Sequence, residues 1–208
     1  GANLRFKGMD GTAQVAQYTA AKGDNIGGVV IGSSTKRSVD SVFPNKVTSI
    51  LRNNTQYNFP QGNEYTVLEV NNQYVYVFYD IHANYTVRAL LAVNKQYEVQ
   101  KNGFYGTQSA DSLKHYDALM YEMINQARLA KNVSALHVSQ GNEVVAYNHS
   151  KDMYSNRYFG HTNLYGQTPM GRYMQQGNGN FYSVGENIAQ GQFNAIFAFE
   201  ELHNSMGH

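Results

Sequence analysis

Residues 158–161 read Tyr-Phe-Gly-His, residues 185–189 read Gly-Glu-Asn-Ile-Ala, and residues 204–208 read Asn-Ser-Met-Gly-His. Each stretch sets a histidine or a carboxylate beside a glycine, where the backbone can turn tightly. Imidazole and carboxylate groups are the donors that a divalent metal or a hydrolytic site uses. We therefore predict that three loops meet in one cleft, lined by two histidines and a glutamate.

Composition excludes several classes of function. The chain has 208 residues, 15% of them charged, with a formal net charge of +1. This balance provides no field that would attract nucleic acid, so we expect no nucleic-acid partner. Cysteine is absent, which excludes disulfides, thiol nucleophiles and Cys-ligated zinc. No stretch reaches the roughly 20 apolar residues of a membrane helix, so we predict no transmembrane segment in this chain.

The first half of the chain has the alternating pattern of β-strands. Asp-Gly between two strand-like runs predicts a hairpin over residues 4–19. A short helix is expected over residues 35–43. β-branched and aromatic residues separated by turns then predict a three-strand meander over residues 65–70, 74–79 and 85–93.

The hydrophobic period changes from 2 to 3.6 near residue 110, which predicts two domains, 1–110 and 111–208. We expect Asp111 to cap the first helix of the second domain, whose apolar stripe starts at Tyr116. Further helices are expected from about Asn142 to Asn156 and from about Asn194 to Asn204. The long glycine-rich segment between them carries two of the three stretches quoted above, and long loops on a helical scaffold often hold a site.

Six short motifs follow one another within residues 115–208. They are Ile124-Asn125-x-x-Arg128, Ala146-x-x-His149-Ser150-x-x-Met153, Tyr158-Phe159-Gly160-His161, Gly166-x5-Arg172, Gly185-Glu186-Asn187-Ile188-Ala189 and Asn204-Ser205-x-Gly207-His208. In this order they resemble the CAP superfamily, which unites cysteine-rich secretory proteins, antigen 5 and plant pathogenesis-related 1 proteins. The lack of cysteines resembles its bacterial branch, the SCP-like extracellular proteins. Residues 1–110 are similar to the CAP-associated N-terminal domain.

The resemblance implies an α+β protein, a β-rich accessory domain followed by a CAP-type α-β-α sandwich. Family members continue past the Gly-His motif with further strands, so we expect the CAP domain to be truncated at its C-terminal end. We also expect the accessory domain to be incomplete at its start. Exposed sheet edges would then favour strand exchange or a homodimer. The resemblance further implies an extracellular or cell-surface location in a Gram-positive-like bacterium.

The resemblance also implies a cleft with two histidines and two acids. His161 and His208 would bind zinc or another divalent cation through neutral imidazoles, with Glu186 as third ligand or as base for a bound water. Glu200 and Glu201 are the candidates for the second acid, and Glu201 is the fourth ligand that we name. The alternative is a hydrogen-bonded network that fixes the loops and holds no metal.

Two classes of function remain open. The first is a binding protein that recognises a lipid, a glycan or a host or cell-surface protein through this cleft. The second is a metal-dependent hydrolase, a peptidase or esterase, with Glu186 as catalytic base. No His-Glu-x-x-His helix is present and no nucleophile elbow surrounds Ser205, so we expect binding rather than catalysis. We expect His149 to be a core histidine, and Arg172 to have a structural role.

Overall fold

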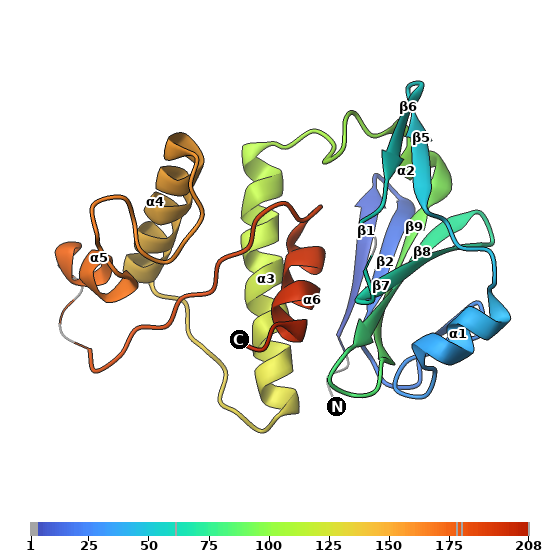
Figure 1. The fold of residues 1–208 in the computed structure, drawn as a ribbon, viewed down its shortest axis with the longest axis horizontal. Helices are drawn as coiled ribbons and strands as arrows, with labels where there is room; N and C mark the ends of the chain where they lie inside the picture. The colour runs from blue at the N-terminus through green and yellow to red at the C-terminus, as the bar shows by residue number, and fades with distance from the viewer. Residues whose placement is uncertain (1–3, 61, 178, 180, 208) are drawn as a thin grey trace. The chain divides into compact units, whose positions relative to one another are not determined.

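The computed structural model describes residues 4–60, 62–177, 179 and 181–207 (Figure 1). The chain divides into two compact units. The first comprises Gly1–Ser134 together with Phe193–His208, and the second comprises Ala135–Gln192. A β-sheet forms the centre of the first unit, whereas helices and loops form the second, so the predicted α+β class is confirmed.

The first unit contains all of the strands among the residues that the structure describes. They are β1 (Arg5–Asp10), β2 (Ala13–Thr19), β3 (Asn25–Ile26), β4 (Val29–Val30), β5 (Ser49–Arg52), β6 (Thr55–Asn58), β7 (Tyr65–Val70), β8 (Gln73–Asp80) and β9 (Thr86–Asn94). Five of them form an antiparallel sheet in the order β1-β2-β9-β8-β7, while β3-β4 and β5-β6 form separate hairpins. The predicted first hairpin and the predicted meander are confirmed.

The helices of this unit are α1 (Lys36–Val42), α2 (Lys95–Gln100), α3 (Ala110–Ala130) and α6 (Ala195–Asn204). The cap of α3 is Ser109, whose side chain accepts from the backbone N–H of Ser112, and not Asp111 as predicted. Asp111 instead lies in the first turn, where its charge favours the helix dipole. Helix α2 and the β3-β4 and β5-β6 hairpins were not predicted. The turn of the β5-β6 hairpin is formed by Asn53 and Asn54 with positive φ.

The sheet is buried on both faces because β8 alternates between two cores. Tyr74, Tyr76 and Phe78 point to one core, and Val75, Val77 and Tyr79 point to the other. Helices α3 and α6 cover the first face, to which they contribute Met123, Ile196, Phe197 and Phe199 (Figure 1). Val29, Ile31 and Val39 cover the second face, from the β3-β4 region and α1.

A β-bulge aims one charged side chain at α6. Phe78 pairs with Ala89 and Tyr79 pairs with Val87, so Arg88 is the extra residue of β9. Its Nη1 lies 2.5 Å from Glu200 Oε2, and the hydroxyl of Tyr18 donates to Glu200 Oε1 at 2.6 Å. Only 4% of the Glu200 side chain is exposed. Arg88 compensates its negative charge, and both of its oxygens have partners on the sheet.

The end of α6 is tied to the turn between β8 and β9. Asn204 Nδ2 donates to Tyr79 O at 3.0 Å, and Asn204 Oδ1 accepts from the backbone N–H of Ile81 at 3.3 Å. His82 Nε2 lies 2.8 Å from Asn204 O. The first residue of the Asn-Ser-Met-Gly-His stretch thus serves as an anchor on the sheet.

The second unit is built on α4 (Gln140–Asn156) and α5 (Pro169–Gln175). Helix α4 agrees with the predicted helix within two residues at its start. Helix α5 lies in the segment that we expected to be a loop. Thr168 caps it by accepting from the backbone N–H of Gly171, and Pro169 occupies its first position, where a missing N–H costs nothing.

Candidate functional site

Two of the three predicted cleft residues meet in the second unit. His161 Nδ1 lies 3.0 Å from Glu186 Oε1, and Arg172 Nη2 lies 2.5 Å from Glu186 Oε2. The side chain of Glu186 is 14% exposed and that of Arg172 is 9% exposed, whereas that of His161 is 52% exposed. The arrangement is a largely buried ion pair that supports one histidine at the surface.

The protonation of His161 follows from its partner. An ionised carboxylate only accepts hydrogen bonds, so the proton of a neutral His161 ring belongs on Nδ1. The lone pair is then on Nε2, the nitrogen that faces away from Glu186. This is the geometry in which a carboxylate orients a histidine for binding a metal or a hydrogen-bond donor.

Arg172 holds the loop that carries His161. Its Nη1 donates to the carbonyl oxygens of His161 at 2.7 Å and of Gln167 at 3.0 Å. Asn163 tightens the same loop, because its Oδ1 accepts from the backbone N–H groups of Tyr165 and Gln167. The structural role expected for Arg172 is confirmed, and its planar guanidinium is suited to bridging several oxygens.

His149 fixes the backbone just before His161. Its ring is 2% exposed and Nε2 lies 3.0 Å from Gly160 O, as expected for a core histidine. The same nitrogen is 3.8 Å from Glu186 Oε1, which is beyond hydrogen-bonding distance. His149 therefore acts through the backbone of Gly160 rather than as a further surface imidazole.

Tyr158, the first residue of the Tyr-Phe-Gly-His stretch, borders the same loop. Its hydroxyl donates to Asp152, one turn before the end of α4. Partial burial and this hydrogen bond raise the pKa of Tyr158 to about 12, so the hydroxyl stays protonated at neutral pH. Its ring lies 6.2 Å from that of His149, measured between centroids.

The other predicted cleft residues do not join this cluster. His208 lies outside the residues that the structure describes, so its prediction is not tested. Glu200 is bound to Arg88 and Tyr18 in the first unit, and these contacts occupy both of its oxygens. Glu201 belongs to the first unit too and its side chain is exposed. Burial, and after it the charge of Glu201, raises the pKa of Glu64.

The side chains of this cluster would supply one ligand for a metal ion, but not a complete set of ligands. Across the described ranges, no group of three His, Cys, Asp or Glu side chains gathers closely enough to hold a metal ion. Both oxygens of Glu186 already accept from Arg172 and His161, which favours an orienting role over direct ligation. His161 Nε2 fits as a ligand, and a second ligand would have to come from beyond this cluster.

Two family models match the chain. The model of the cysteine-rich secretory protein family, CAP, matches residues 121–208, and that of the CAP-associated N-terminal domain matches residues 8–104. No curated protein is similar enough in sequence to count as a match. In the part of the chain that is described, no helix is long and apolar enough to cross a membrane.

Two solved structures share the fold. An extracellular protein containing an SCP domain from Bacillus anthracis str. Ames is 21% identical, with a TM-score of 0.80 over 99% of this chain and 72% of that chain. A cysteine-rich secretory protein from Staphylococcus aureus subsp. aureus Mu50 is 13% identical, with a TM-score of 0.69 over the same shares. At these identities the likeness concerns the fold alone.

Proposed function

We propose that this chain, a member of the bacterial SCP branch of the CAP family, is an exported binding protein that contacts its ligand through His161. It carries a CAP-associated N-terminal domain ahead of its CAP domain. The observation that carries this proposal is the His161–Glu186–Arg172 cluster. It holds an exposed imidazole by its Nδ1, which leaves Nε2 as the ring nitrogen that does not face Glu186.

A divalent cation such as zinc is the ligand that this imidazole favours. We propose His161 as its protein ligand in the second unit, with Glu186 hydrogen-bonded to it as the orienting carboxylate. His208 stays the second ligand that the sequence predicts. Zinc accepts neutral imidazole nitrogens, and an orienting carboxylate makes the ring a better donor. A bound cation would leave open positions for an oxygen or nitrogen of a larger partner.

The geometry favours binding over hydrolysis. A general base needs a carboxylate oxygen that is free to take a proton from water. Glu186 instead accepts from a guanidinium on one oxygen and from an imidazole on the other. We therefore conclude that binding is the function. Metal-dependent hydrolysis is the alternative, and cleavage of peptides or esters by the metal-loaded chain would support it.

Calorimetric titration of zinc into the metal-stripped chain tests the proposal. We expect saturable binding that His161→Ala abolishes. Glu186→Gln should weaken it by roughly 10- to 100-fold, as is typical when the partner of a ligating histidine is altered. His137→Ala is the matched control, because His137 is an exposed histidine of the same unit outside the cluster.

Two outcomes would contradict the proposal. Binding that survives His161→Ala would place the metal elsewhere, and the absence of binding in a folded chain would remove the metal altogether. His208→Ala separates the two imidazoles, because loss of affinity in that variant alone would make His208 the primary ligand. Circular dichroism of each variant confirms that the fold is intact.

The remaining partner and location expectations belong to this proposal. The Bacillus anthracis neighbour is described as extracellular, and we extend that location to this chain. The partner would be a lipid, a glycan or a cell-surface protein.

The sheet edges, β1 and β7, offer a route to a homodimer. However, Lys7 and the bulge after Gly8 are features that protect an edge, so light scattering should show whether β1 pairs at all.

A further inference from the structure

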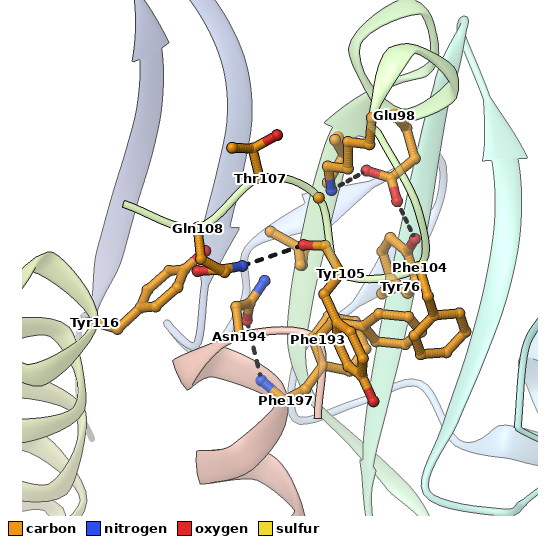
Figure 2. A pocket seen from close by; sticks show the side chains of 14 residues that line it. Tyr76, Glu98, Phe104, Tyr105, Thr107, Gln108, Tyr116, Phe193, Asn194 and Phe197 are labelled. Atoms are coloured by element: carbon orange, nitrogen blue, oxygen red, sulfur yellow. Dashed lines mark hydrogen bonds and ion pairs between the residues drawn. The ribbon is translucent and has the colours of Figure 1, made fainter. Parts of the chain in front are cut away.

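A pocket of about 180 Å³ opens in the first unit, formed by residues that the proposed metal site does not use (Figure 2). Its floor is the sheet face at β8 and β9, where Tyr76, Leu91 and Val93 lie. Helix α2, the chain from Lys101 to Gln108, Tyr116 of α3 and the start of α6 complete the walls. The pocket therefore lies where the sheet, α6 and this connecting loop meet.

A buried arginine holds the wall of this pocket in place. Arg52 is 3% exposed, and its Nη1 donates to Gly103 O at 2.9 Å and Phe104 O at 3.0 Å. Its Nε donates to Glu98 O and its Nη2 to Glu98 Oε1. These hydrogen bonds hold the backbone of residues 103 and 104 against α2 and so position the wall of the pocket.

One wall of the pocket is aromatic. The rings of Phe104 and Phe193 lie 4.7 Å apart between centroids, those of Phe193 and Phe197 4.9 Å, and those of Phe104 and Tyr105 4.9 Å. Tyr76 adds its ring 5.2 Å from Phe197. These rings support one another and offer a rigid apolar surface, against which the face of a second ring can pack.

The facing side is polar and uncharged. Asn194 caps α6 by accepting from the N–H groups of Ile196 and Phe197, and its amide nitrogen points away from the helix, on the side of Gln108 (Figure 2). Gln108 Nε2 donates to Tyr105 O at 3.2 Å, which leaves Oε1 as an acceptor. Thr107 lies on the same side of the pocket and adds a hydroxyl.

The charges at the pocket are already compensated. Glu98 pairs with Arg52 at 2.7 Å and with Lys101 at 2.5 Å, and it accepts from the hydroxyl of Tyr76 at 3.2 Å. An ionic ligand would have to compete with these pairs. The ligand chemistry that fits is a neutral group with one apolar face and several hydroxyl or amide groups.

From this geometry we propose that the pocket binds one neutral sugar ring of a glycan. The C–H face of the ring packs on Phe104, Phe193 and Tyr105, and its hydroxyl groups bond to Asn194 Nδ2 and Gln108 Oε1. The volume limits the ligand to one ring, because a closed apolar cavity of about 150 Å³ holds a single benzene ring and this open pocket measures about 180 Å³. The polar side favours a sugar over a plain aromatic ring, which could not make hydrogen bonds to these two amides.

Titration of the complete chain with monosaccharides, followed by NMR of the side-chain amides, tests this site. The probes are glucose, galactose, mannose and N-acetylglucosamine, with phenol and inorganic phosphate as probes of other chemistry. We expect at least one sugar to bind with a millimolar dissociation constant and to shift the Asn194 and Gln108 amide signals. Binding of phenol or phosphate without any sugar would overturn the assigned class, and binding of none would overturn the site.

Variants locate the contact. Asn194→Ser retains a capping oxygen for α6 but removes the Nδ2 donors, and Gln108→Ala removes the acceptor. Each should weaken sugar binding by roughly fivefold, the effect of one hydrogen bond, with an unchanged melting temperature. Gln14→Ala, on the exposed face of β2, is the matched control. Unchanged affinity in both pocket variants would show that the sugar binds elsewhere and would overturn the proposal.

Discussion

At the scale of single residues, the hydrogen bonds of Asp24 make the stability of the fold depend on pH in the acid range. Arg5 donates to both of its oxygens, at 2.6 and 2.7 Å, and the hydroxyl of Thr19 donates to one of them. The hydrogen bonds from Arg5, followed by that from Thr19, lower the pKa of Asp24 to about 2. The folded state therefore holds this proton less tightly than the unfolded state, whose aspartate has a pKa of about 3.9.

We predict that the stabilisation by Asp24 is present above about pH 4 and is lost as the pH falls towards about 2, because the folded pKa is depressed. Thermal unfolding of Asp24→Asn should show a lower melting temperature than the unaltered chain at pH 7, and the gap should close by pH 2. Asp117→Asn, an exposed aspartate of α3, should show no such closing gap. A gap that stays constant from pH 7 to 2 would contradict the assignment.

The residue scale also shows what sequence could provide. His161 and Glu186 were predicted from motif order, and they do meet at 3.0 Å. The second oxygen of Glu186 accepts from Arg172, for which the sequence favoured a structural role through contacts with acids or backbone carbonyls. Asn163 was missed, although an asparagine four residues before Gln167 in a glycine-containing loop is a signal for a side-chain turn.

At the scale of elements, the contact between β9 and α6 depends on the bulge at Arg88. The family resemblance made Glu200 one of two candidates for the second cleft acid, because it lies on the helix from which that acid comes. Its partners lie far away in the chain, Tyr18 at 182 residues and Arg88 at 112 residues. Such a bulge has no local signature, because it is defined by the pairing of two strands and not by the residues of one.

We predict that Arg88→Leu destabilises the fold by about 3–5 kcal/mol, because it leaves Glu200 as an uncompensated buried charge. The double variant Arg88→Leu, Glu200→Gln should be more stable than Arg88→Leu alone. The introduced amide would have no charge, and its oxygen would still accept from Tyr18. Urea denaturation measures both. The single variant Glu200→Gln completes the comparison. If the loss of unfolding free energy in the double variant equals the sum of the losses in the two single variants, the two side chains do not interact.

The anchor at the end of α6 provides a second test at this scale. Asn204→Ala removes the two side-chain hydrogen bonds, to Tyr79 O and from Ile81 N. It should cost about 1–3 kcal/mol, because Tyr79 O is left without this partner in a buried position and Ile81 N in a partly buried one. Asn142→Ala, at an exposed position of α4, should change stability by less than about 0.5 kcal/mol. Equal losses in the two variants would contradict the anchoring role.

At the scale of the whole molecule, burial differs between the two compact units. In the first unit β8 and β9 are buried along most of their length, with Val75, Val77 and Leu90 fully inaccessible. In the second unit the buried side chains are few among the residues described. They are Val145, His149, Met153, Arg172 and Tyr173. Burial of apolar area dominates stability, so the two units should differ in resistance to opening.

We predict that hydrogen exchange followed by mass spectrometry finds the slowest amides in β8 and β9 and faster exchange throughout residues 135–192. Zinc should slow exchange in the peptides around His161 and Glu186 if the proposed metal site is occupied, since a ligand stabilises the state it binds. Peptides of β8 and β9 serve as the internal reference. Equal protection in the two units would contradict the link between burial and opening.

The segments of the fold that sequence predicted best are those with a strong local period. The alternation of β8 and the apolar stripe of α3 were both predicted, and both pack into cores. Helices α2 and α5 were missed because each is short. Helix α2 has 6 residues and follows directly on Asn94, the last residue of β9, and α5 has 7 residues within a glycine-rich segment. The division into units reflects contacts between distant segments, which a linear pattern does not contain.

The aromatic face of α6 has a consequence for anyone who divides this protein into fragments. Phe197 packs on Tyr65, Tyr76 and Phe78, with centroid distances of 5.5, 5.2 and 5.2 Å. A recombinant fragment that ends before Phe193 would expose those three rings of the sheet to water. Such an exposed apolar surface favours aggregation. The strands near the start of the chain and the helix near residue 200 are therefore best cloned, expressed and purified together.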